Sequence, residues 1–378
     1  MKYFFIILIS FFCLKIFSQT SSWNQLCKLD QRMIHSSGIL TLNNGETFWT
    51  QVDNSSPGVI YEIDKDCNVL RTITITNVPK TDWEDIAHDD MGNIYIGDFG
   101  NNNNNRTNLK IYILRNVNQH TSDTISAEII KFSYANQKEF PPHASEQNFD
   151  IEAMVWYDDS LHLFSKNRTN PFTGYTYQYS IPAISGDYKL FPVDSFKTGD
   201  GPMVFFWITG AAINQGDKQL VLLSHDRIWM FTEFESSRFF QGSSRMITLP
   251  TYSQKEGIGY AKENTWYLTD EYFSTLGLGG NLYEMKLESL TDVDDNDVIE
   301  FDIQPNPASE FLKILFPDNK EEREIKIYDY MGKLCMNYSI NQLRNTIPMR
   351  DLANGIYIVK TISKNWRKTF SKKIIVIK

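Results

Sequence analysis

The stretch DWEDIAHDDMGNIYIGD, residues 82–98, has carboxylates at both ends of two short apolar segments. Asp, Met, Gly and Asn separate these segments, a pattern that is typical of a β-hairpin. The second strand of a hairpin returns to the end at which the first strand began. Glu84 and Asp98 are therefore expected at one edge of a sheet.

The same layout recurs four times, with a small or acidic start, an apolar strand, a polar turn and a second apolar strand. The other copies are SSGILTLNNGETFWTQ (36–51), IEAMVWYDDSLHLFSK (151–166), GAAINQGDKQLVLLSH (210–225) and KEGIGYAKENTWYLTD (255–270). Aligning the second strands without a gap brings five residues to one repeat position: Ser37, Glu84, Glu152, Ala211 and Glu256. Fourteen residues later stand Gln51, Asp98, Lys166, His225 and Asp270.

Further strand-like segments follow each hairpin, so that most units hold four strands. Four strands per unit at periods near 40 to 50 residues indicate a β-propeller, here over residues 19–290. The fifth unit lacks one strand, which WNQLCKL at 23–29 can supply to close the ring. We expect five blades, and a six-bladed ring with one degenerate unit is the alternative.

In a propeller the first strands line a central channel in one direction, so equivalent residues form rings. Glu84, Glu152 and Glu256 would repel each other in such a ring unless a cation or shifted protonation relieves them. Carboxylate oxygens suit Ca²⁺, and the neighbouring Asp85 is a further candidate ligand. The alternative is that these acids are solvated or hydrogen-bonded to neighbouring strands.

Side chains of both signs are expected at the same mouth, where Asp98, Lys166, Arg168, His225 and Asp270 are candidates for binding a ligand. A metal with a possible general base could also hydrolyse a phosphate ester or a lactone, with His225 and Lys166 as candidate catalytic residues. His225 could equally be a strand-end residue making a local hydrogen bond. The local signatures of zinc proteases, serine hydrolases and P-loop enzymes are missing from the sequence. Binding is therefore the preferred hypothesis, and a metal-dependent hydrolase is the alternative.

Residues 1–18 combine an early Lys, an apolar run and a small residue, which indicates a cleavable secretory signal and no membrane anchor in the mature chain. The net charge of the whole chain is −9, although residues 301–378 carry 14 Lys and Arg against 8 Asp and Glu. The middle region is therefore acidic, which argues against nucleic acid as a partner. An exported protein could join Cys27 to Cys67 in a disulfide, and two buried thiols are the alternative.

After an acidic linker at 291–300, the pattern of residues 301–378 predicts a small, basic, Ig-like β-sandwich. Its ordered motifs closely resemble the type A C-terminal sorting domain of type IX secretion. The matching residues are Pro305, Asn306 and Pro307, then Gly332 and Lys333 in IKIYDYMGK, then Gly355 and Tyr357 in LANGIYIVK. The resemblance implies export, recognition by the type IX translocon and its sorting protease, and release or attachment at the surface of a Gram-negative, Bacteroidota-type cell.

The strand starts WED, IEA and KEG resemble those of secreted propellers of the phytase-like, lactonase-like and calcium-dependent nucleotidase groups. SSGILTL together with residues 82–102 resembles a set of uncharacterised exported propellers more closely. That resemblance implies a fold and no activity.

Overall fold

The computed structural model describes residues 22–53, 58–79, 82–262, 264–274, 277–287, 301–316, 323–329, 333–340, 345–362 and 369–378. The predicted signal at 1–18 and the predicted linker at 291–300 lie outside these ranges. Within the described ranges, no helix has the length and apolar character needed to cross a membrane.

Residues 22–287 form five sheets with short 3₁₀ turns. The first sheet contains β2 (Ser36–Leu42), β3 (Thr47–Val52), β4 (Val59–Asp64), β5 (Val69–Ile75) and β9 (Thr124–Ile125). The second contains β6 (Trp83–His88), β7 (Ile94–Asp98), β8 (Lys110–Leu114), β10 (Glu128–Tyr134) and β14 (Gly186–Leu190). The third contains β11 (Asp150–Tyr157), β12 (Ser160–Lys166), β13 (Tyr175–Pro182) and β15 (Pro192–Lys197).

The fourth sheet contains β16 (Gly210–Asn214), β17 (Gln219–Leu223), β18 (Arg227–Thr232) and β19 (Ser243–Thr248). The fifth contains β20 (Lys255–Lys262), β21 (Thr265–Asp270), β22 (Asn281–Lys286) and β1 (Ser22–Lys28). The 3₁₀ turns are η1 (Asn43–Gly45), η2 (Val117–Gln119), η3 (Ala144–Glu146), η4 (Met203–Phe205) and η5 (Phe239–Gln241). The five predicted hairpins are the first two strands of each sheet.

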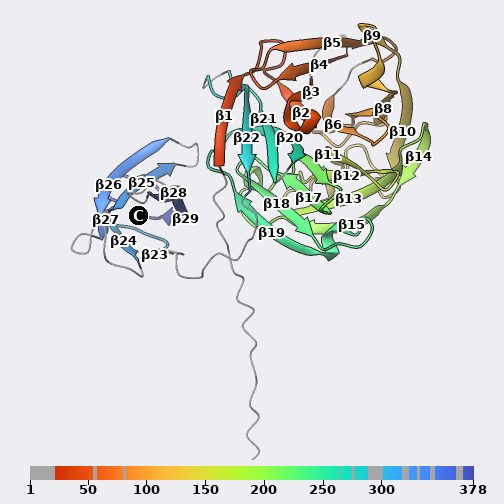
Figure 1. The fold of residues 1–378 in the computed structure, drawn as a ribbon. Coiled ribbons are helices and arrows are strands. Elements are labelled where there is room, and N and C mark those ends of the chain that lie inside the picture. The colour runs from red at the N-terminus through yellow and green to blue at the C-terminus, as the bar shows by residue number, and fades with distance from the viewer. Residues whose placement is uncertain are drawn as a thin grey trace, which may run out of the picture.

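The first strands of the five sheets contact one another in sequence order, and β20 of the fifth sheet contacts β2 of the first. Figure 1 shows the sheets arranged around a common centre in a propeller-like fold. This close approach requires small residues on the inner strands. A Cβ added at Gly210 would lie 2.4 Å from the backbone oxygen of Glu256.

Apolar side chains alternate along each strand and therefore fill the spaces on both faces of a sheet. On β2, Leu40 packs in a cluster with residues of the second sheet, whereas its neighbour Ile39 packs in a cluster with the fifth. Three further clusters join the second sheet to the third, the third to the fourth and the fourth to the fifth. The hydrophobic core is thus a circle of five inter-sheet layers.

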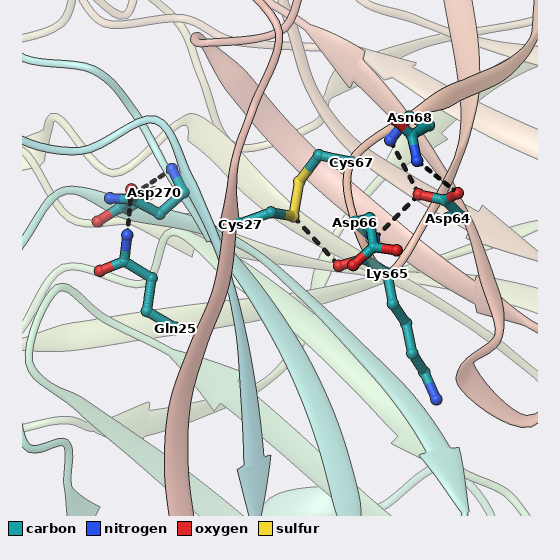
Figure 2. The surroundings of a disulfide bond; sticks show 9 residues. Gln25, Cys27, Asp64, Lys65, Asp66, Cys67, Asn68 and Asp270 are labelled. Carbon is teal, nitrogen blue, oxygen red and sulfur yellow. Dashed lines mark hydrogen bonds between the residues drawn. A yellow bond between two sulfur atoms is a disulfide. The ribbon is translucent and has the colours of Figure 1, made fainter.

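The strand β1 completes the fifth sheet by pairing antiparallel with β22, as expected from residues 23–29. A disulfide joins Cys27 on β1 to Cys67 in the turn after β4, so the disulfide alternative holds (Figure 2). The turn is organised by Asp64, whose carboxylate accepts the backbone N–H groups of Asp66 and Asn68. The disulfide therefore links the fifth sheet covalently to the first.

The stretch KLFPVDSF at 189–196 has the composition of one short strand, but the structure divides it. The segment divides at Phe191 into β14, which pairs parallel with β10 of the second sheet, and β15, which pairs with β13 of the third. Pro192 begins β15, and a proline cannot donate a ladder hydrogen bond, so it is suited to this strand boundary. β9 likewise joins β5 of the preceding sheet in parallel. These two additions cover the outer edges of the first two sheets.

Residues 301–378 contain two sheets that share one hydrophobic core. One sheet contains β23 (Asp302–Gln304), β24 (Phe311–Leu315) and β27 (Thr346–Pro348). The other contains β26 (Leu334–Ile340), β25 (Arg323–Asp329), β28 (Gly355–Ile362) and β29 (Thr369–Val376). Both β26 and β27 lie between the motifs IKIYDYMGK and LANGIYIVK and belong to neither.

Candidate functional site

Three glutamates from three different sheets form a compact group, which we call the glutamate cluster: Glu84 on β6, Glu152 on β11 and Glu256 on β20. One carboxylate oxygen from each lies within 4.8 Å of the others, and all three residues are buried. Each glutamate lies within a bulge, because the pairing register shifts around it in all three strands. A bulge leaves a residue unpaired and re-aims its side chain, which explains why these residues leave the regular alternation.

Burial of the glutamate cluster makes full ionisation costly. Burial and the neighbouring Glu152 carboxylate raise the pKa of Glu84 well above its ordinary value. Burial, only partly offset by Lys166, also raises the pKa of Glu152. For Glu256, burial is outweighed by Lys166 and His225, which hold its pKa below the ordinary value. The neighbouring cations therefore do not fully compensate the negative charge of the three carboxylates.

Two cationic side chains already contact Glu152. The ammonium Nζ of Lys166 lies 3.0 Å from Glu152 Oε2, and Arg168 Nη2 lies 3.3 Å from Glu152 Oε1. Arg168 Nε also donates to Asp150 Oδ2 at 2.7 Å. Both cations lie over the ring of Trp207, with Lys166 Nζ at 5.4 Å and Arg168 Cζ at 4.7 Å from the ring centroid.

His225 approaches the glutamate cluster from the loop after β17. Its Nε2 lies 3.9 Å from Glu256 Oε1, too far for a hydrogen bond. Neither ring nitrogen has a hydrogen-bond partner in the part of the chain that the structure describes, although the side chain is only 9% exposed. The rings of Trp207 and Tyr252 flank it at 6.5 and 5.9 Å. A buried imidazole normally has a partner, so this one is available to a ligand.

A second tier of acids surrounds the glutamate cluster. Burial raises the pKa of Asp82 to about 6 despite the nearby Arg106, and burial together with Glu256 raises the pKa of Glu271 to about 8. A Cβ added at Gly100 would lie 2.0 Å from Glu84 Oε1 and 2.6 Å from Asp82 Oδ2. The lack of a side chain at Gly100 therefore lets both carboxylates occupy this space.

Asp85 was a predicted metal ligand, but its carboxylate points elsewhere. Its Oδ1 accepts the N–H of Ile86 at 2.8 Å, and its Oδ2 accepts the N–H of Met154 at 2.7 Å. Asp85 is fully buried and joins β6 to β11 instead of contributing an oxygen to the glutamate cluster. The structure thus favours a structural role for this residue.

Asp98 and Asp270 were predicted to bind a ligand, and the structure places their oxygens inside their own sheets. Asp98 accepts from Arg106 at 2.7 Å and from Tyr112 at 3.0 Å. Asp270 accepts from the Asn281 N–H and the Tyr283 hydroxyl, both at 2.8 Å. Both carboxylates are essentially fully buried, and these donors hold them at the strand ends.

Sequence reasoning assigned no role to Asp82, Asp150 or Trp207. A short repeated pattern could have identified the two aspartates, because Asp precedes Glu by two residues at both Glu84 and Glu152. Trp207 comes from an irregular loop between the third and fourth sheets, and no periodicity marks it.

The motif residues of the C-terminal part also have structural roles. Asn306 accepts the N–H of Ile375 at 2.9 Å and donates to the Lys373 carbonyl at 3.0 Å, which fixes the Pro305–Pro307 segment to β29. The Tyr357 hydroxyl donates to the Ala353 carbonyl at 3.0 Å. Gly355 begins β28, and Lys333 precedes β26. Gly332 lies outside the described residues.

Residues 302–377 match the family model of the secretion system C-terminal sorting domain. This part of the chain is therefore a type IX sorting domain, and the chain is handled by that secretion system for export to the cell surface or the extracellular space. No curated protein matches the chain.

Several solved structures are similar to the chain at low identity. The PQQ-bound aldose sugar dehydrogenase of Streptomyces coelicolor is 10% identical, over 71% of this chain and 99% of that one, with a TM-score of 0.41. A gluconolactonase of Xanthomonas campestris is 9% identical, over 72% of this chain and 88% of that one, with a TM-score of 0.39. The extracellular domain of a putative hybrid two-component system from B. thetaiotaomicron is 11% identical, over 91% of this chain and 50% of that one, with a TM-score of 0.31.

Proposed function

We propose that the chain is a five-bladed β-propeller that binds an extracellular ligand beside a divalent cation held by the glutamate cluster. The observation that carries the proposal is the convergence of three buried carboxylates from separate sheets, next to a buried imidazole without a hydrogen-bond partner. Ca²⁺ binds oxygens at about 2.3–2.6 Å, so two of its ligand atoms can be up to about 5 Å apart. The 4.8 Å limit on the glutamate oxygens fits that ion.

Five blades are supported by the circle of inner-strand contacts and by the five inter-sheet clusters. β1 supplies the outer strand of the fifth sheet, so every sheet has at least four strands. This arrangement favours five blades over the six-bladed alternative. The blades would occupy residues 19–290, followed by the linker at 291–300 and an Ig-like sorting domain at 301–378.

The cation proposal is tested by thermal unfolding of the chelator-treated protein with and without Ca²⁺. A ligand present at a thousandfold excess over its Kd stabilises the native state by about 4 kcal/mol, so we expect Ca²⁺ to raise the Tm by several degrees. The double variant Glu84→Gln, Glu256→Gln should lose this shift. The matched control is Glu46→Gln, Glu128→Gln, which removes two charges from exposed ion pairs and should keep it. An equal Ca²⁺ response in both double variants would refute the site.

A metal-dependent hydrolase is the second candidate, favoured by the free ring nitrogens of His225 beside Glu256. Such a nitrogen could accept a proton from an attacking water. The hydrolase hypothesis predicts cation-dependent activity on phosphate esters or lactones that His225→Gln abolishes while Ca²⁺ binding persists. If no such activity is found in the Ca²⁺-loaded protein, the binding function stands alone.

For export, we propose an N-terminal secretory signal, passage through the type IX translocon of a Bacteroidota-type cell, and removal of the C-terminal domain by the sorting protease. Deletion of residues 301–378 should leave the protein in the periplasm, detected by cell fractionation. Unchanged appearance of the truncated protein outside the cell would contradict this route.

A further inference from the structure

We propose that Lys166 is a resident cation which a divalent metal displaces from Glu152, and that Lys166 then joins Arg168 in binding an oxyanion of the ligand. This inference rests on the proposed cation site and deepens it, because it assigns the chemical class of the ligand and the order of binding. The oxyanion is a carboxylate or a phosphate group of the ligand.

Both carboxylate oxygens of Glu152 already contact cationic side chains. Lys166 lies 3.0 Å from one of its carboxylate oxygens and Arg168 lies 3.3 Å from the other. A metal that ligates Glu152 must therefore compete with a positive charge at the same oxygens. Within the described ranges, Glu152 is the only ion-pair partner of Lys166, so displacement removes the one direct ion pair of this ammonium.

An aromatic ring lies next to the position that the displaced Lys166 ammonium would occupy. Lys166 Nζ already lies 5.4 Å from the centroid of the Trp207 ring, which stabilises a cation but does not neutralise it. Arg168 shares the same ring and keeps its bond to Asp150. Loss of the Glu152 contact would thus create a pair of cations on one aromatic surface, and an oxyanion is their natural partner.

The His225 imidazole is a second, independent indication of a ligand beside the glutamate cluster. His225 is buried, points its Nε2 toward Glu256 and has no hydrogen-bond partner among the described residues. Trp207 lies beside both His225 and the two cations. A polar anion bound here would give the imidazole a hydrogen-bond partner and would neutralise the two cations.

The wild-type full chain provides the main test. Binding of inorganic phosphate and of acetate is measured by calorimetry in the presence of a chelator and in the presence of saturating Ca²⁺. We expect Ca²⁺ to tighten the binding of at least one oxyanion by about tenfold or more, and the oxyanion to tighten Ca²⁺ binding by the same factor. Comparing the two anions distinguishes a phosphate ligand from a carboxylate ligand.

Lys166→Met separates the role of Lys166 from simple attraction between metal and anion. This variant should bind Ca²⁺ more tightly than the wild type and should lose most of the Ca²⁺ effect on the oxyanion. Lys197→Met is the control, because Lys197 pairs with the exposed Asp200 and should change neither quantity. A folded Lys166→Met protein that binds Ca²⁺ more weakly would overturn the inference.

Chemical labelling provides a readout that needs no variant. Acetylation of Lys166, followed by mass spectrometry of the wild type, should increase with Ca²⁺ and decrease again when the oxyanion is added. If Ca²⁺ binds but neither oxyanion affinity nor Lys166 labelling changes, the inference fails while the proposed cation site stands. If Ca²⁺ does not bind at all, the proposed function itself fails.

Discussion

The bulges at Glu84, Glu152 and Glu256 decide where their carboxylates point, because a regular strand would alternate these side chains into the inter-sheet layers. The equivalent residues of the other two sheets are Ser37 and Ala211, which carry no charge. At this repeat position a negative charge is therefore present in three of the five sheets, and His225 of the fourth faces Glu256.

Gly100 is a residue-scale test of this geometry. We predict that Gly100→Ala displaces Glu84, because the new methyl group would lie 2.0 Å from its Oε1 atom. Disturbing the surroundings of a metal ligand typically lowers metal affinity by about 10- to 100-fold, so Ca²⁺ titration should show a loss in this range. Gly216→Ala is the control, since Gly216 is exposed and has ample space. Equal Ca²⁺ affinity in both variants would argue against Glu84 as a ligand.

His162, on β12 and outside the glutamate cluster, makes the stability of the fold depend on pH. Its Nδ1 accepts from Gln178 at 3.3 Å while its Nε2 donates to the Tyr157 carbonyl at 3.2 Å, which suits the neutral ring. Burial lowers the pKa of His162 from 6.5 to about 4. Between about pH 6.5 and 4, His162 is therefore protonated in the unfolded chain while it stays neutral in the folded chain.

We predict that this difference costs up to about 3 kcal/mol of stability as the pH falls from 6.5 to 4 and costs nothing above pH 7. His162→Gln should flatten the decline in the free energy of unfolding over that interval, measured by denaturant titration at several pH values. His143→Gln, at an exposed turn residue, is the control. A pH profile of His162→Gln parallel to that of the wild type would contradict the assignment.

At the scale of elements, the fifth sheet is completed by β1, a strand that lies more than 200 residues before the rest of that sheet in the sequence. This strand is held by its pairing with β22, by the stacking of Trp23 on Tyr283 at 4.9 Å, and by the disulfide. The cysteines are 40 residues apart in sequence, so the disulfide restricts a long loop in the unfolded chain.

We predict that the double variant Cys27→Ser, Cys67→Ser loses about 4 kcal/mol of unfolding free energy, as expected for a loop of this length. Urea unfolding followed by tryptophan fluorescence measures the loss. Cys335→Ser, at an exposed free cysteine, should match the wild type. If the double variant is as stable as the oxidised wild type, the disulfide does not stabilise the link between the fifth sheet and the first.

The hairpins, and the addition of residues 23–29 to the last sheet, could be predicted from sequence because apolar alternation and turn residues are local signals. The separation of β14 from β15 could not, since it depends on which sheet edge each half meets. The hydrogen-bond partners of Asp85 and Asp98 could not be predicted either, because the sequence does not distinguish a carboxylate that faces a ligand from one that accepts backbone or tyrosine donors. Trp207 was missed because its irregular loop has no repeat.

At the scale of the whole molecule, one chain combines an acidic propeller-like body with a basic sorting domain. The two parts have separate tasks. The sorting domain directs export, whereas the glutamate cluster lies entirely within residues 84–256. Export and ligand binding should therefore be separable by mutation.

The central claim is that three sheets place their glutamates around one divalent cation. The most direct measurement is a crystal structure of the Ca²⁺-loaded protein with anomalous scattering from the ion. We predict one peak bounded by carboxylate oxygens of Glu84, Glu152 and Glu256 at about 2.3–2.6 Å. No peak there at saturating Ca²⁺, with Lys166 still bound to Glu152, would contradict the account.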